Sequence, residues 1–275
     1  MAELKFSVAI SVYRGDHPQY FRRALDSITT EQTVKPAEIV LVVDGPVSAE
    51  IDAVIDDFAS RYDIFQIIRL EQNKGLGNAL RLAVEAGSYE LIARMDSDDV
   101  AVSDRFEQQL KVFQSDSRID IVGGDITEFI GEEEHVVATR AVPCSDADIK
   151  KYMKTRCALN HVSVMYKKSA VLRCGNYKDL FWNEDYYLWI RMLERGCVMA
   201  NTGTVLVNVR TGTDMYKRRG GTAYFKSEKF LQDYMLRQKI ISLPTYCINI
   251  CARLIMQVLL PTSVRGWVFR TFARS

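Results

Sequence analysis

Residues 1–124 alternate between short apolar runs and amphipathic stretches, and this alternation restricts the possible folds more than any other feature of the chain. The runs are rich in β-branched residues, as in buried strands, whereas the stretches repeat their apolar residues at helical spacing. The expected strands are residues 6–12, 38–43, 65–70, 90–95 and 119–122, and the expected helices are residues 18–29, 48–60, 76–86 and 103–114. Asp16 is the expected N-cap of the first helix. Because strands separated by helices are joined by right-handed crossovers, the pattern predicts a Rossmann-like α/β fold with a mostly parallel sheet flanked by helices.

The second half of the chain is less regular. Its expected elements are a hairpin of residues 126–130 and 135–140, strands at 161–166 and 205–210, and helices at 147–155 and 184–194. The composition is that of an ordinary globular protein, with 48% hydrophobic and 26% charged residues. Since neither an internal repeat nor a linker is visible, we expect one domain over residues 1–230, divided near residue 124, and a separate tail of residues 231–275.

Charge is distributed unevenly along the chain, although the formal net charge is only +1. Residues 1–233 hold all 35 acidic residues and 30 of the 36 basic ones, which gives them a formal charge of −5. The remaining six basic residues lie in residues 234–275, which contain no Asp or Glu. A general nucleic-acid-binding protein would carry a basic body, so nucleic acid is excluded as a partner.

The tail is both apolar and basic. Residues 240–260 are the most hydrophobic stretch, but Pro244 and Arg253 interrupt them, and no uninterrupted apolar run is long enough for a spanning helix. We therefore expect basic amphipathic helices that lie on an anionic membrane surface. The alternative is a pair of helices packed on the protein's own core.

The six cysteines are irregularly spaced and show no zinc-binding pattern, which favours free thiols in a reducing compartment over a disulfide set. The N-terminus runs directly into the first strand, without the features of a signal peptide. We expect a cytoplasmic protein that is peripheral on the inner face of the cell membrane.

Polar residues follow three strands of the expected sheet, where parallel α/β sheets bind their ligands. Ser11, Val12 and Tyr13 end the first strand, and Asp44 follows the second, where it could equally form a turn before Gly45-Pro46. The fourth strand leads into Asp96-Ser97-Asp98-Asp99. Three carboxylates so close together repel one another, and a hard divalent cation would neutralise them. An acidic surface loop, with Asp99 capping the next helix, is the simpler alternative.

Two later segments also carry reactive or charged groups. Glu184 and Asp185 open an aromatic helix, where a carboxylate can act as a general base or can simply favour the helix dipole. Arg218 and Arg219 belong to the sequence YKRRGG, which suits a loop that clamps phosphate and would also suit a solvated basic loop.

Six segments in this order resemble the family 2 glycosyltransferases, which are inverting enzymes with the GT-A fold. The segments are SVYRGD, LVVDG, NKGLGNAL, ARMDSDD, NEDYYLWIRM and YKRRGG, and together they span about residues 5–225. Each motif alone is weak, but six in order are specific. The likeness is greatest to bacterial enzymes that build capsule, O-antigen or exopolysaccharide, and it implies a nucleotide-sugar half at residues 1–124 and an acceptor half at residues 125–230.

The resemblance also implies roles for individual residues. The residues implied to contact the nucleotide are Ser11, Val12 and Tyr13 at the end of the first strand, Asp44 against the nucleobase, Lys74, and Asp96 near the ribose. Asp98 becomes the direct metal ligand beside Asp96, with Asp99 in support. Asp185 matches the catalytic base, with Glu184 as its neighbour, and Arg218 and Arg219 match basic residues that cover the diphosphate. Trp189 is expected to pack in the core, and His161 matches a recurring position of undefined role.

The activity implied is inverting transfer of a sugar from a nucleoside diphosphate sugar, with UDP favoured, to a saccharide or lipid-linked saccharide. Mn²⁺ or Mg²⁺ is the implied cofactor. A sugar nucleotidyltransferase is the main alternative, although residues 13–16 do not form the Gly-rich phosphate loop expected of one. A non-catalytic nucleotide-sugar-binding protein with the same fold is the other.

Overall fold

The computed structural model describes residues 4–212 and 221–260, and its first half has nearly the predicted bounds. The elements in chain order are β1 (Phe6–Val12), α1 (Pro18–Ile28), β2 (Glu38–Val43), α2 (Ala49–Arg61), β3 (Phe65–Arg69), α3 (Leu76–Ala86), β4 (Leu91–Met95), β5 (Val100–Ala101) and α4 (Arg105–Ser115). One cap differs from the prediction. The N-cap of α1 is His17, whose Nδ1 accepts a hydrogen bond from the backbone N–H of Gln19 at 3.3 Å. Asp16 instead accepts a hydrogen bond from the backbone of Tyr13.

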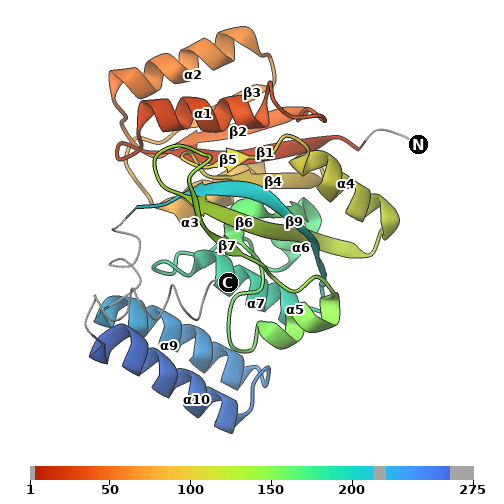
Figure 1. The fold of residues 1–275 in the computed structure, drawn as a ribbon, viewed down its shortest axis with the longest axis vertical. Helices are drawn as coiled ribbons and strands as arrows, with labels where there is room; N and C mark the ends of the chain where they lie inside the picture. The colour runs from red at the N-terminus through yellow and green to blue at the C-terminus, as the bar shows by residue number, and fades with distance from the viewer. Residues whose placement is uncertain (1–3, 213–220, 261–275) are drawn as a thin grey trace.

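The second half adds strands to the same sheet. Its elements are β6 (Ile119–Phe129), β7 (Val136–Arg140), α5 (Asp146–Tyr152), a 3₁₀ turn (His161–Ser163), β8 (Met165–Lys167), α6 (Lys168–Arg173), α7 (Glu184–Glu194), β9 (Val198–Arg210), α9 (Thr222–Arg237), α10 (Leu243–Leu254) and a π-helical turn (Ile255–Leu259). The strand order is β3-β2-β1-β4-β8-β6-β9-β5, and β7 pairs with β6 (Figure 1).

The sheet is parallel from β3 through β4 and mixed beyond it. β8 pairs in antiparallel fashion with both β4 and β6, so the predicted fifth strand does not lie directly beside the fourth. The expected strand at 161–166 is wrong in its first part, because residues 161–163 form the 3₁₀ turn. The mostly parallel α/β fold is confirmed, and the antiparallel insertion reflects hydrogen bonding between segments far apart in the chain.

Two predicted strands of the second half are parts of longer ones. Residues 119–122 and 126–130 join in β6, and residues 205–210 are the end of β9. Gly123 and Gly124 leave room for side chains of β9, because a Cβ atom would lie 2.4 Å from the side chain of Asn201 at the first position and 2.5 Å from that of Leu206 at the second. The predicted hairpin with β7 is confirmed.

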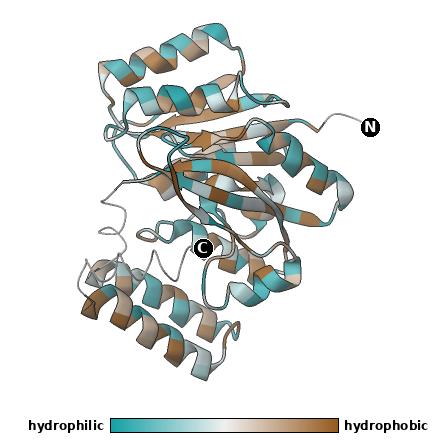
Figure 2. Ribbon diagram, viewed as in Figure 1, coloured by the Kyte–Doolittle hydropathy of each residue, from teal (hydrophilic) through white to brown (hydrophobic). Residues whose placement is uncertain are grey.

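Apolar side chains fill both faces of the sheet, and its strands are predominantly hydrophobic (Figure 2). One cluster contains Phe21 of α1, Phe58 of α2 and Phe106 of α4, all fully buried. The opposite cluster extends from Leu80 of α3 to Trp189 of α7. Each such side chain stabilises the fold by about 1.5–3 kcal/mol relative to an exposed position.

Helices α9 and α10 lie side by side at the end of the molecule opposite α2 (Figure 1). Helix α9 runs through the position at which the tail was expected to begin, and its Leu231 and Met235 join the hydrophobic core. Within the described residues, no helix combines the length and the apolar character needed to cross a membrane.

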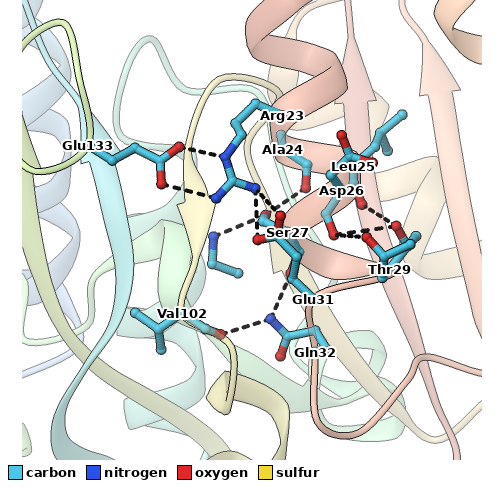
Figure 3. Close-up of polar contacts among 12 residues, drawn as sticks. Arg23, Ala24, Leu25, Asp26, Ser27, Thr29, Glu31, Gln32, Val102 and Glu133 are labelled. Atoms are coloured by element: carbon cyan, nitrogen blue, oxygen red, sulfur yellow. Dashed lines mark hydrogen bonds and ion pairs between the residues drawn. The ribbon is translucent and has the colours of Figure 1, made fainter.

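Polar contacts attach α1 to its surroundings (Figure 3). The side-chain N–H of Gln32 donates to the carbonyl oxygens of Ser27 at 2.7 Å and Val102 at 2.8 Å. Arg23 forms ion pairs with Glu31, beyond the end of α1, and with Glu133, in the turn between β6 and β7. These contacts hold α1 against the segment that follows β5 and against the β6–β7 turn.

Candidate active site

The acidic loop, residues 96–99, follows β4 at the carboxyl edge of the parallel strands. One carboxylate oxygen from each of Asp96, Asp98 and Asp99 lies within 4.8 Å of the others. Burial, and then repulsion from Asp96, raise the pKa of Asp98 to about 6 and shift the pKa of Asp99 in the same direction. These clustered oxygens form a donor set that suits a hard divalent cation, whose charge would lower both pKa values again.

Asp16 is a fourth acidic residue at this edge, and its contribution was missed from the sequence. Burial raises its pKa, a hydrogen bond with Ser97 lowers it, and the negative charge of Asp96 raises it further. Asp16 in turn raises the pKa of Asp98. Its position in SVYRGD, just beyond the first strand, was the available signal.

Arg94 places a positive charge beneath the acidic loop. Its side chain is 1% exposed, its Nη2 forms an ion pair with Asp96, and its Nε and Nη1 lack hydrogen-bond partners among the described residues. Burial raises the pKa values of Glu184 and Asp185, and the positive charge of the guanidinium partly opposes this rise. Arg94 is therefore within electrostatic reach of both sets of acidic residues that the sequence singled out, the acidic loop and the Glu184–Asp185 pair.

Asp44 and the 73–75 loop come together at the end of β2. The carboxylate of Asp44 accepts hydrogen bonds from the backbone N–H groups of Lys74 at 2.7 Å and Gly75 at 3.0 Å. Gly75 has a φ of +86°, a conformation that favours glycine. The backbone at Gly45 also approaches closely, since a Cβ there would lie 2.6 Å from the amide nitrogen of Asn73. The structure thus joins Asp44 and Lys74, which the sequence separates by 29 residues.

The residues at the end of β1 occupy the adjacent strand. Ser11 and Val12 pair with Val42 and Val43 of β2, which places them beside Asp44. Tyr13 is 45% exposed, and its backbone N–H donates to Asp16 at 2.9 Å. Three strand ends therefore converge on one edge of the sheet, as the sequence predicts.

Glu184 and Asp185 begin α7. Burial, and then the negative charge of Asp185, raise the pKa of Glu184 to about 7, and burial also raises the pKa of Asp185. Glu184 lies against the start of α3, where a Cβ at Gly77 would be 3.4 Å from the Cβ of Glu184. A carboxyl group that titrates near neutrality can exchange a proton with a substrate at physiological pH.

Behind this pair lies a buried aromatic cluster. Trp189 is fully buried against His161, Tyr166 and Tyr177, so its predicted packing role is confirmed. His161 Nε2 lies 3.1 Å from the hydroxyl oxygen of Tyr177, and burial holds the pKa of His161 well below its usual range. The half-buried His161 ring is therefore neutral, and this contact holds it in the aromatic cluster.

The two predicted phosphate-clamping residues, Arg218 and Arg219, lie outside the described residues. A different arginine, Arg210 at the end of β9, reaches the acidic loop. Its backbone N–H donates to the Asp99 carboxylate at 2.9 Å, and its Nε donates to the carbonyl oxygen of Asp98 at 3.2 Å. Arg210 belongs to none of the six sequence motifs, so only the structure reveals this contact.

Known proteins share this fold. Over 92% of this chain and 73% of the other, the structure superimposes with a TM-score of 0.67 and 14% identity on S. aureus TarS 1-349 in complex with UDP-GlcNAc. The mannosyltransferase PcManGT from Pyrobaculum calidifontis, in complex with GDP-Man and Mn²⁺, gives a TM-score of 0.62 at 14% identity, over 98% of this chain and 76% of the other. These are GT-A glycosyltransferases, so the predicted fold class is confirmed.

Sequence relatives agree. The chain is 36% identical over 270 residues to an Escherichia coli UDP-Gal:alpha-D-GlcNAc-diphosphoundecaprenol beta-1,3-galactosyltransferase, covering 98% of this chain and 97% of the relative. It is 37% identical over 232 residues to the amylovoran biosynthesis glycosyltransferase AmsE of Erwinia amylovora, covering 84% and 85%. Residues 7–181 match the model of glycosyl transferase family 2. This protein is an enzyme, a glycosyltransferase rather than a nucleotidyltransferase, and it belongs to glycosyl transferase family 2.

Proposed function

We propose that this enzyme transfers a sugar, with inversion, from a UDP-sugar to a saccharide or lipid-linked saccharide. The observation that carries the proposal is the placement of Arg94 within electrostatic reach of both the acidic loop and the Glu184–Asp185 pair. The carboxylates of the acidic loop suit a cation-bound diphosphate, and the Glu184–Asp185 pair suits an acceptor hydroxyl. Both sets of carboxylates interact with the same guanidinium, which supports a single site that would take donor and acceptor together.

The names of similar proteins support the choice of substrates. The Escherichia coli relative uses UDP-Gal and a GlcNAc carried on diphosphoundecaprenol, and the TarS structure contains UDP-GlcNAc. We therefore favour a UDP-sugar as donor and a lipid-linked saccharide as acceptor.

The donor's nucleotide would lie along the ends of β1 and β2. Ser11, Val12 and Tyr13 would line the nucleotide site at the end of β1, and Asp44 and Lys74 would contact the nucleoside from the end of β2. Arg218 and Arg219 would cover the diphosphate, where guanidinium groups bind phosphate oxygens in pairs.

Asp98 and Asp96, supported by Asp99, would hold Mn²⁺ or Mg²⁺. Such an ion, when bound, offsets the negative charge that grows on the leaving diphosphate. Asp185 accepts the proton of the acceptor hydroxyl, and the oxygen forms a bond to C1 of the sugar. The C1–O bond to the diphosphate breaks on the opposite face, so the anomeric configuration inverts. One displacement needs one base and no covalent enzyme intermediate.

The Asp185→Asn variant tests the role of the base. We expect sugar transfer to fall by about 10²–10⁴-fold, the contribution typical of a general base, while UDP binding in the presence of Mn²⁺ stays unchanged. Asp179→Asn provides a matched control on the segment before α7. Full activity in Asp185→Asn would disprove the assignment.

Helix α10 supports a second proposal, that the enzyme binds an anionic membrane surface on the inner face of the cell membrane. Its exposed large side chains, and those of the π-helical turn that continues it, are apolar, and apolar residues recur along this helix in Figure 2. The largest exposed side chains on it are Leu243 at 61%, Ile248 at 68%, Ile255 at 49% and Leu259 at 65%.

The inward face of the same helix is polar. Asn249 is buried and donates hydrogen bonds to Gln232 at 2.8 Å and to the carbonyl oxygen of Lys154 at 2.9 Å. Arg253 forms a largely buried ion pair with Glu228 at 2.6 Å. A helix with polar residues inward and apolar residues outward reverses the usual pattern of a surface helix.

Residues 234–275 contain six basic residues and no acidic ones, and this charge indicates what binds the apolar face of α10. An anionic bilayer complements this charge, whereas a second copy would bring like charges together. We expect the full chain to sediment with vesicles of phosphatidylglycerol and phosphatidylethanolamine, and not with phosphatidylcholine alone.

Truncation after residue 235, or Leu243→Ser with Ile248→Ser, should abolish this sedimentation. The matched control is Leu172→Ser with Val137→Ser, which changes exposed apolar residues elsewhere. If the full chain never sediments, or forms a dimer through α10, the membrane proposal is wrong while the catalytic proposal stands.

A further inference from the structure

Arg210 connects four segments around the acidic loop. Its Nε donates to the carbonyl oxygen of Asp98 at 3.2 Å, and its Nη1 donates to the carbonyl oxygen of Gly131 at 2.8 Å. The guanidinium carbon lies 3.9 Å from the ring centroid of Tyr20 and 4.6 Å from that of Phe129. One side chain thus joins the end of β9 to the acidic loop, the β6–β7 turn and α1.

The backbone of Arg210 makes a further contact with the loop. Its N–H donates to the buried carboxylate of Asp99 at 2.9 Å. The strand end therefore holds the loop twice, through the carbonyl of Asp98 and the carboxylate of Asp99. Because both acceptors lie in the loop, its backbone and one of its carboxylates are fixed together.

The β6–β7 turn, residues 130–135, is itself fixed to α1. Glu133 accepts hydrogen bonds from Arg23 Nε at 2.5 Å and Nη2 at 3.0 Å, in the paired geometry that Figure 3 shows. Arg23 Nη1 donates to Glu31 at 2.9 and 2.8 Å. Paired arginine–carboxylate contacts fix orientation as well as distance. The turn is thus a firm support for the far end of the Arg210 side chain.

Only arginine fits all of these contacts. The planar guanidinium can stack on aromatic rings while its edge donates to two acceptors in different directions. Lysine keeps the charge, but its ammonium group cannot span Asp98 and Gly131 with the same stacking. Methionine keeps much of the apolar contact and removes both side-chain donors.

We propose that Arg210 is a positioning residue, which holds the acidic loop in its cation-binding conformation while the Glu133–Arg23 pair supports it through the β6–β7 turn. The link to cation binding rests on the metal site proposed above. The positioning of the loop itself does not depend on that site, so the two can be tested separately.

The first experiment compares Arg210→Met and Arg210→Lys with the unchanged full chain. Binding of Mn²⁺ in the presence of UDP is measured from the electron paramagnetic resonance signal of the free ion, and exchange of the backbone amides of residues 96–101 is measured by mass spectrometry. We expect Arg210→Met to weaken Mn²⁺ binding about tenfold, as the loss of two hydrogen bonds implies, and to speed amide exchange in the loop. For Arg210→Lys, we expect both Mn²⁺ binding and the rate of amide exchange to lie between those of the unchanged chain and those of Arg210→Met.

Arg118→Met is the matched control, because Arg118 is 81% exposed in an ion pair with Asp116. It should alter neither readout. A purely structural role for Arg210 would lower the melting temperature without changing Mn²⁺ binding in the folded protein, and that result would overturn the proposal. If the unchanged chain binds no Mn²⁺, the metal site is wrong, and amide exchange alone decides whether Arg210 positions the loop.

The second experiment removes the support from a distance. Glu133→Gln and Arg23→Gln leave every contact of Arg210 in place, yet each should weaken Mn²⁺ binding about threefold. The double variant should be no worse than Arg23→Gln, because that substitution already removes the Arg23–Glu133 pair together with the Arg23–Glu31 pair. Glu107→Gln, which breaks a surface ion pair with Lys111, should have no effect. Additive effects, or no effect of Glu133→Gln, would disprove the supporting role of the turn.

Discussion

The buried guanidinium of Arg94 forms an ion pair with Asp96, at the point where β4 gives way to the acidic loop. The arginine is 1% exposed and the aspartate is 29% exposed. The charge that balances this carboxylate therefore comes from beneath the sheet edge, and the solvent side of the loop stays open. Burial raises the pKa of Asp185 and the same guanidinium partly opposes that rise, so the loop and the proposed base share one cation.

Arg94→Met should raise the pKa of Asp185, because a favourable positive charge is lost. Since the base must be ionised to act, the rise of the transfer rate with pH should move to higher pH. The variant should also lower the free energy of unfolding by about 1–3 kcal/mol, less than for a fully buried ion pair, because the Asp96 carboxylate left behind is 29% exposed. Rate profiles and urea unfolding measure the two effects, and an unmoved profile would contradict the coupling.

Asp98→Ala should weaken the dependence of UDP binding on Mn²⁺, since the proposed direct ligand is lost. The dependence is measured as the thermal shift that UDP causes in the presence and in the absence of Mn²⁺. Removal of the ion from the unchanged protein by a chelator should give the same loss. Asp104→Ala, just before α4, is a suitable control outside the acidic loop. A variant that keeps the full Mn²⁺ effect would exclude Asp98 as a ligand.

Asp44→Asn should loosen the 73–75 loop. A carboxylate accepts hydrogen bonds from Lys74 and Gly75 on separate oxygens, whereas an amide offers one acceptor. We expect a loss of about 1–2 kcal/mol in the free energy of unfolding and weaker UDP binding. Denaturation and calorimetry would measure these losses. If stability is unchanged while UDP binding weakens, Asp44 would act only by contacting the nucleotide directly, and not by holding the 73–75 loop.

Glu184 should make both stability and activity depend on pH near neutrality. Its pKa rises from 4.5 to about 7 in the folded protein, so the folded state binds the proton more tightly than the unfolded state. The free energy of unfolding should therefore decrease as pH rises from 4.5 to about 7. Glu184→Gln should flatten this dependence in chemical denaturation series, and an unchanged slope would refute the assignment.

The same titration bears on the rate. Ionisation of Glu184 brings a second negative charge beside Asp185, which raises the basicity of Asp185 as pH increases. The transfer rate should accordingly rise between about pH 6 and pH 8, near the pKa of about 7. In Glu184→Gln this part of the profile should disappear, while the step that belongs to Asp185 remains.

The sequence by itself determined the β1–β4 half of the fold and the edge at which the site lies. Local apolar periodicity reports which residues face a core, and carboxylates directly after a buried strand, such as Asp44 and Asp96, must lie at that strand's end. Both are properties of a few consecutive residues. For this reason strand and helix bounds in residues 1–118 were predicted almost correctly.

Tertiary structure alone decided the rest. The insertion of β8 between β4 and β6 depends on backbone hydrogen bonds between distant segments, which no local pattern encodes. The contacts of Arg210 with the acidic loop and of Glu133 with Arg23 join residues more than 100 positions apart, so they depend on how the sheet and its turns meet. An arginine at a strand end reads as an ordinary charged residue until folding brings its acceptors within hydrogen-bond distance.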